Sequence, residues 1–168
     1  MLLKRISVTT ANNSKTNCYI IADEYTKEAM VIDPGGEPEK IITMLEVLDV
    51  KLKYIVLTHC HGDHIGAAPE IKKTKGGKIL IHRLESESVN DRNINLVEYV
   101  GMNDDIKIDV DARLDDEDLI HIGEIAFRVI HTPGHTRGSI CLYCAQEKLL
   151  ISGDTLFNGT WGRTDLPT

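Results

Sequence analysis

The sequence predicts a layered α/β protein, and three observations lead to this prediction. Short β-rich runs separated by turn signals open the chain, and the apolar run at 54–58 is typical of a strand buried on both faces. Between them, residues 37–48 have the apolar spacing of a helix with one buried face. After residue 58 the pattern returns to helix and then to strand, which is the order of a layered α/β fold.

The first third of the chain is expected to form an antiparallel meander followed by a helix. Strands are expected at 3–9, 18–22 and 30–33, and the Pro-Gly-Gly turn at 34–36 closes the last of them. In the helix at 37–48, Pro38 stands in the first turn, where its missing N–H is tolerated. The apolar face consists of Ile41, Ile42, Leu45 and Leu48.

The rest of the chain continues the alternation. We expect a helix at 65–73 that Gly76 and Gly77 terminate, and then a buried strand at 78–82. Residues 84–100 are polar with weak helical periodicity, and the acidic stretch 104–118 is expected to be a solvated surface loop. Gly123 is expected to form the turn of a β-hairpin. The remaining strands are expected at 119–122, 124–130, 139–144 and 149–152.

Length and charge restrict the protein class. A chain of 168 residues with 42% hydrophobic composition is expected to form one domain over residues 1–168. A formal net charge of −7 argues against nucleic acid as a partner. No apolar run is long enough to span a membrane, and residues 1–8 lack the features of a signal peptide. We therefore expect a cytoplasmic protein.

The four cysteines are expected to be free thiols in a reducing compartment. Cys141 and Cys144 form a C-x-x-C, which would also be compatible with a redox pair or half of a zinc ribbon. They stand in an apolar run typical of a strand, where positions three apart face opposite sides. Because the sequence has no second C-x-x-C, buried core cysteines are the preferred interpretation.

Residues 58–64, Thr-His-Cys-His-Gly-Asp-His, place three imidazoles and one carboxylate directly after the buried strand. In an extended loop, side chains at i and i+2 point the same way, so His59 and His61 can bind one metal ion. Gly62 allows a turn, after which Asp63 and His64 can approach a second metal ion. This ligand set suits Zn²⁺, with iron or manganese as alternatives. Helix capping alone would not require three histidines.

Two further strand ends carry residues of ligand type. His135 follows a Pro-Gly turn after the strand that ends near His131, and we expect His135 to be the ligand and His131 to be structural, although spacing alone does not decide between them. Asp154 follows the last apolar strand, and its two oxygens could bridge two cations. Since active sites of layered proteins collect at strand ends, these residues are expected to meet.

The motifs His59-x-His61-x-Asp63-His64, Thr-Pro-Gly-His135-Thr and Ser-Gly-Asp154-Thr together resemble, in this order along the chain, the metallo-β-lactamase superfamily. The resemblance implies an αββα sandwich with two metal ions at one edge of the two sheets. It implies that His59, His61 and His135 bind the first metal, Asp63 and His64 bind the second, and Asp154 bridges them. The aspartate at 154 is similar to the hydrolase branch, because β-lactamases of the commonest class have a cysteine there.

Residues 154–167 are similar to the small bacterial glyoxalase II-like proteins, or hydroxyacylglutathione hydrolases. The resemblance implies hydrolysis of a small thioester or ester by a metal-bridging hydroxide, with two zinc ions per chain and Asp63 as the catalytic residue. Arg163 and Asp165 either brace the loops around the site or form a surface ion pair. The alternatives are an iron-dependent persulfide dioxygenase, with one iron held by two histidines and an aspartate, and a non-catalytic fragment.

The sequence departs from the family pattern at its C-terminal end. The family supplies a further histidine to the second metal from a downstream turn, and this chain stops at Thr168 before such a turn. We therefore expect an αββα sandwich that lacks the final strand and helix. Truncation, completion of the site by another chain as in a homodimer, and a weakly bound second metal are left as alternatives. We also expect this chain to lack the helical substrate-binding domain of glyoxalase II.

Overall fold

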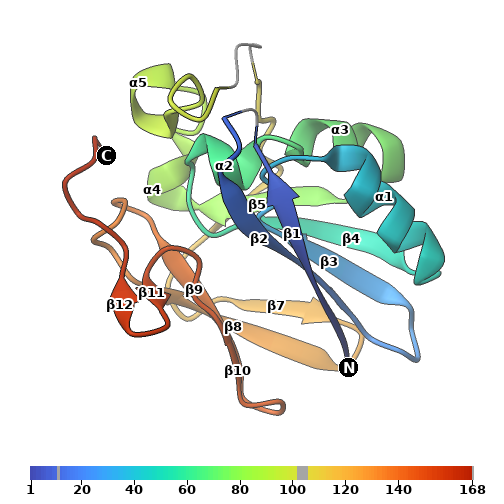
Figure 1. Ribbon diagram of the computed structural model, residues 1–168. Helices are drawn as coiled ribbons and strands as arrows, with labels where there is room; N and C mark the ends of the chain where they lie inside the picture. Colours follow the sequence, from blue (N-terminus) through green and yellow to red (C-terminus); the bar gives the residue numbers. More distant parts are fainter. Residues whose placement is uncertain (11, 102–105, 168) are drawn as a thin grey trace.

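Two β-sheets face each other in the computed structural model, which describes residues 1–10, 12–101 and 106–167 (Figure 1). The first sheet has six strands that lie side by side in chain order. These strands are β1 (Leu2–Thr9), β2 (Lys15–Ala22), β3 (Glu28–Ile32), β4 (Lys51–Leu57), β5 (Lys78–His82) and β6 (Ala112–Leu114). The first three strands are antiparallel, as predicted, and β3 to β6 are parallel.

The second sheet is antiparallel with the strand order β10-β9-β8-β7. Its strands are β7 (Leu119–Ile122), β8 (Ile125–His131), β9 (Ile140–Cys144) and β10 (Leu149–Ile151). The predicted hairpin is confirmed, because β7 pairs with β8 and Gly123 occupies the turn with a φ of 54°. A short separate hairpin follows, formed by β11 (Leu156–Phe157) and β12 (Thr160–Trp161).

The helices cover the outer face of the first sheet (Figure 1). They are α1 (Pro38–Val47), α2 (Gly62–Ile65), α3 (Ala68–Lys75), α4 (Arg83–Ser86) and α5 (Arg92–Asn95). The helix predicted at 37–48 is confirmed as α1, with Ile41 and Leu45 buried. In the described ranges, no helix covers the outer face of the second sheet. The structure is therefore the predicted αββα sandwich without its last helical layer.

The helix expected at 65–73 is confirmed in part, because α3 covers residues 68–73 of it, whereas Ile65 belongs to the separate helix α2. The Ala67 amide donates to the carbonyl of Pro34 at 2.8 Å instead of continuing a helical ladder. Pro69 then stands in the first turn of α3, where the missing N–H is tolerated. A tertiary contact therefore ends α2 one turn after His61, which keeps the histidine-rich segment at the end of the sheet.

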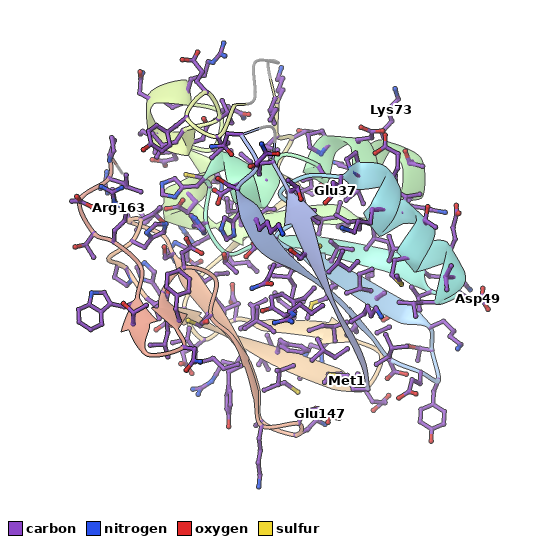
Figure 2. The ribbon with its side chains drawn as sticks, in the orientation of Figure 1. Met1, Glu37, Asp49, Lys73, Glu147 and Arg163 are labelled. Carbon is purple, nitrogen blue, oxygen red and sulfur yellow. The ribbon has the colours of Figure 1, made fainter. Side chains whose placement is uncertain are left out.

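The buried strand predicted at 54–58 is confirmed as the inner part of β4. Ile55 and Leu57 belong to the hydrophobic core between the first sheet and the helices. Val56 belongs to the second core between the two sheets, with Phe127 of β8 fully buried beside it. The stick view shows side chains filling this inner space and Arg163 pointing away from it on the C-terminal segment (Figure 2). Both faces of β4 are therefore covered.

The loop expected at 104–118 was only partly correct. Residues 102–105 lie outside the described residues, and 112–114 form β6 at the edge of the first sheet. A three-residue strand between acidic residues is too short to show alternation, and the neighbouring β5 defines it. The four cysteines are buried and free, as expected. None of the helices in the described part of the chain is long and apolar enough to cross a membrane.

Candidate metal centre

The predicted site residues meet at one end of the sandwich, where strands from both sheets terminate. His59 follows β4, His135 lies in the loop between β8 and β9, and Asp154 follows β10. Asp63 and His64 belong to α2, directly after the turn at Gly62. Figure 1 shows α2, α4 and the β11–β12 hairpin around this end of the molecule. The fold therefore brings together three segments that are far apart in the sequence, namely residues 59–64, His135 and Asp154.

Two groups of ligand-type side chains lie at this end. The first consists of His59, His61 and His135, and the second of His59, His64 and Asp154; within each group the ligand atoms lie within 4.8 Å of one another. His61 Nδ1 is 3.0 Å from His135 Nε2. All four histidines are buried. The expectation that the histidine cluster, His135 and Asp154 come together is therefore met by the geometry.

Asp154 joins the two groups. Its Oδ1 lies 3.3 Å from His64 Nε2, and its Oδ2 lies 3.6 Å from His135 Nε2. One carboxylate therefore directs one oxygen to each group, which is the arrangement that a bridging ligand requires.

Asp63 stands beside the second group rather than inside it. Its Oδ2 accepts a hydrogen bond from Thr16 Oγ1 at 3.2 Å and lies 3.7 Å from His64 Nε2. Its side chain is 25% exposed, so it faces the solvent side of the centre. His131, in contrast, lies outside both groups and stacks on His82 with ring centroids 4.2 Å apart.

The unsatisfied nitrogens of the site fit a metal ion. Within the described residues, His59 Nε2 and His61 Nε2 are buried and have no hydrogen-bond partner. Such groups are rare in folded proteins because an unpaired buried polar atom costs free energy. A divalent cation bound by imidazole nitrogen and carboxylate oxygen would satisfy His59 Nε2, and His61 would face it through Nδ1, the nitrogen beside His135. The residues present therefore fit a metal centre.

Electrostatics prepare two of the histidines for this role. Burial lowers the pKa of His61 to about 4, and the neighbouring His135 contributes to the shift. Burial also lowers the pKa of His59 well below its ordinary value. Both rings are therefore neutral near pH 7 and have a lone pair available for a metal.

His64 and Asp154 behave differently, because they form a charged pair. Burial opposes the charge on His64, but Asp33 and Asp154 raise its pKa well above the ordinary value. Burial likewise opposes the charge on Asp154, but His64 lowers the pKa of that carboxyl. In the metal-free chain a proton on His64 therefore occupies the place of a cation.

Hydrogen bonds behind the histidines fix which nitrogen faces the centre. His135 Nδ1 donates to the carbonyl of Arg163 at 2.8 Å, which leaves the lone pair on Nε2. Thr58 Oγ1 donates to Asp33 Oδ2 at 2.8 Å, so this hydroxyl accepts from His59 Nδ1, which is 3.1 Å away. His59 Nε2 therefore also carries a lone pair. The roles of Asp33, Thr58 and the Arg163 carbonyl were not predicted from the sequence.

Close backbone approaches explain two glycines near the centre. A Cβ atom on Gly35 would lie 1.6 Å from the carbonyl oxygen of Asp63, and one on Gly162 would lie 1.8 Å from that of Asp154. Only glycine fits at these positions without displacing the segments that carry the two carboxylates.

Two cavities open onto the centre, and Asp63, Asp154 and Phe157 line both of them. One has a volume of about 360 Å³ and a polar wall that includes Lys15. The other has a volume of about 320 Å³ and is mainly apolar, with Tyr99 in its wall. The centre is therefore accessible to a small molecule from two sides.

Comparison with known proteins agrees with this geometry. A family model described as the metallo-beta-lactamase superfamily matches residues 11–168. Hydroxyacylglutathione hydrolase GloC of Haemophilus influenzae is 37% identical over 157 residues, which cover 90% of this chain and 71% of that protein. The crystal structure of BLEG-1 B3 metallo-beta-lactamase is similar with a TM-score of 0.87 and 35% identity, covering 98% of this chain and 78% of that one. The structure of TTHA1623 in a di-iron-bound form has a TM-score of 0.81 and 28% identity, covering 96% and 78%.

Proposed function

Because the chain belongs to the metallo-β-lactamase superfamily, we propose that it is a zinc-dependent hydrolase of small acyl thioesters, of the hydroxyacylglutathione type. The single observation that carries the proposal is the position of Asp154 between the two ligand groups, at 3.3 Å from His64 and 3.6 Å from His135. A carboxylate between two ligand groups is typical of a dinuclear hydrolase centre. The relative from H. influenzae, named as a hydroxyacylglutathione hydrolase, supports this substrate class.

The proposed centre has a defined distribution of roles. His59, His61 and His135 would hold the first ion, Asp63 and His64 would hold the second, and Asp154 would contribute to both. Zinc held by these residues would provide Lewis-acid chemistry, namely activation of water and polarisation of a carbonyl group. Asp63 is the catalytic residue, because its partly exposed carboxylate lies in the wall of both cavities, where it can orient the attacking water. A thioester suits this site because a thiolate leaves without a general acid.

The proposal also covers the setting of the enzyme. Residues 1–168 form one domain, the ligand is a small thioester or ester, and neither nucleic acid nor a membrane is a partner. A homodimer is left open. The cytoplasm is the proposed location, because four free cysteines suit a reducing compartment. Iron is the alternative metal, since the similar protein TTHA1623 has a di-iron-bound form.

The test combines metal analysis with turnover. Protein purified without added metal is analysed for zinc, iron and manganese per chain, and thiol release from S-lactoylglutathione is measured beside hydrolysis of a β-lactam. We expect two zinc ions per chain and thiol release. D154A is expected to lower the rate by about 10²–10³-fold, as for other groups that act on the transition state. H121A, at an exposed position on β7, is the control and is expected to retain the wild-type rate.

The outcomes separate the alternatives. One iron per chain with oxygen consumption on a persulfide would replace the proposal by a dioxygenase. A metal-free chain without turnover would leave a non-catalytic fragment. Wild-type rates in D154A would contradict the bridging role.

A further inference from the structure

Glu85 is a buried carboxylate that belongs to neither ligand group. It lies in the short helix α4 and is 2% exposed. Its Oε2 accepts a hydrogen bond from the Cys60 amide at 2.9 Å, and its Oε1 accepts one from the Gly138 amide at 2.7 Å. A buried carboxylate with both oxygens bonded to backbone amides forms strong, charge-assisted hydrogen bonds.

The two amides belong to the two loops that carry the first ligand group. Cys60 stands between His59 and His61, and Gly138 stands three residues after His135. A Cβ atom on Gly138 would lie 2.7 Å from Glu85 Cγ, so the second loop lies directly against α4. One side chain therefore connects the two loops at positions next to the ligands.

The connection matters because ligands from different loops must converge. His61 Nδ1 and His135 Nε2 are 3.0 Å apart, although their residues are 74 positions apart in the chain. A backbone hydrogen bond from the Ile140 amide to the Thr58 carbonyl, at 3.0 Å, joins the same two loops farther from the imidazoles. Glu85 adds a second connection, and the pair of connections fixes the angle as well as the distance between the loops.

We propose that Glu85 is a positioning residue of the metal centre, which holds His61 and His135 at the separation that the first metal ion requires. This inference rests on the proposed metal centre and is independent of the substrate. Glutamine has nearly the same shape, but its amide group has one acceptor oxygen and one NH₂. In E85Q the NH₂ faces one of the two backbone amides, and one loop is released.

Asp23 offers a matched control away from the centre. It directly follows β2, whose N-terminal end, at Thr16, lies beside Asp63. It is 3% exposed and likewise connects two segments, because it accepts hydrogen bonds from the amides of Tyr25, Thr26 and Glu124. These amides belong to the β2–β3 turn and the β7–β8 hairpin, so Asp23 touches no ligand loop. D23N therefore reports the cost of losing a buried carboxylate connection without an effect on the centre.

The experiment compares wild type, E85Q and D23N by cobalt binding. Co²⁺ affinity is measured by competition with a chromophoric chelator, the cobalt d–d absorption spectrum reports the ligand geometry, and thermal unfolding of metal-free protein reports stability. In E85Q we expect about 10–100-fold weaker binding, the usual loss for a residue that orients metal ligands, and a changed d–d spectrum. D23N is expected to unfold at a lower temperature with the affinity and the spectrum unchanged.

Several results would overturn the proposal. One is cobalt affinity and a d–d spectrum in E85Q that equal those of the wild type. Another is an equal loss of cobalt affinity in E85Q and D23N. If E85Q does not fold, E85D is measured, since its shorter side chain keeps the charge but reaches only one amide; weakened cobalt binding in folded E85D supports the proposal. If neither Glu85 variant folds while D23N does, Glu85 serves the fold alone. Cobalt binding without thioester turnover in the wild type would contradict the proposed function and leave this inference intact.

Discussion

Thr58→Val tests whether the hydrogen bonds behind His59 prepare the centre. The substitution keeps the shape of the side chain and removes the hydroxyl, which donates to Asp33 Oδ2 at 2.8 Å and lies 3.1 Å from His59 Nδ1. Asp33 retains the Thr58 amide at 2.8 Å and His64 Nδ1 at 3.0 Å. His59, which is 1% exposed, has no comparable replacement. The main loss therefore falls on His59 Nδ1.

The magnitude follows from the number of unpaired groups. One buried donor without a partner costs about 1–3 kcal/mol, and the weakened contacts of Asp33 bring the expected loss to about 2–3 kcal/mol. For a chain of this size such a loss lowers the melting temperature by about 4–12 °C. Since the ring of His59 is no longer held in one tautomer, zinc affinity is expected to fall by about 10–100-fold.

The assay measures urea and thermal unfolding of the metal-free protein, and zinc affinity by chelator competition. Thr10→Val is the control, because Thr10 is 4% exposed and its hydroxyl donates to Asn12 Oδ1 at 2.8 Å in the β1–β2 turn. It is expected to lose stability and to keep its zinc affinity. If T58V binds zinc as tightly as wild type, the hydroxyl does not orient His59 and the reasoning fails.

Two further predictions concern the backbone around Asp63 and the acid stability of the fold. G35A places a methyl group 1.6 Å from the Asp63 carbonyl oxygen and is expected to lower the free energy of unfolding, measured in urea, by about 3 kcal/mol. The control G159A has a φ of 81° and no neighbouring atom within 4 Å, so it should lose about 1–2 kcal/mol. Equal losses in the two variants would contradict the close approach at Gly35. Backbone hydrogen bonds from Thr26 and Glu124 lower the pKa of Asp23 below 3.8, so its contribution is present above about pH 4 and is lost as the pH falls through the lowered pKa. The stability difference between wild type and D23N should therefore narrow in thermal unfolding below about pH 4, and a constant difference down to pH 2 would argue against this assignment.

The sequence predicted the elements whose pattern is local. The inner part of β4 was visible as a continuous apolar run, and the β7–β8 hairpin was visible from alternation around Gly123. β6 was not visible, because three residues at a sheet edge depend on pairing with β5. The break between α2 and α3 has a local signal in Pro69, which is unfavourable inside a helix, and a second cause in the hydrogen bond from Ala67 to Pro34, which joins distant segments and is not visible in the sequence.

The same distinction applies to the site. Three ligand-bearing segments could be found because histidine and aspartate have a distinctive chemistry at strand ends. The roles of Asp33, Thr58 and Glu85 could not be assigned, because they depend on contacts that the fold creates. Thr58 reaches Asp33, 25 positions away, and Glu85 reaches Gly138, 53 positions away. The carbonyl of Arg163 leaves no signal in the sequence at all, since every residue has one.

Buried carboxylates around the histidines link the centre to the fold. Asp33 is 1% exposed and Glu85 is 2% exposed, and each accepts hydrogen bonds from a segment that carries candidate metal ligands. An uncompensated buried carboxylate costs several kcal/mol, and in the metal-free chain His64 compensates Asp33 and Asp154, which raise its pKa. A divalent cation bound there would supply positive charge in place of that proton and would release the proton from His64. Asp33 and Glu85 therefore hold the segments of the candidate centre together in the chain without a metal ion.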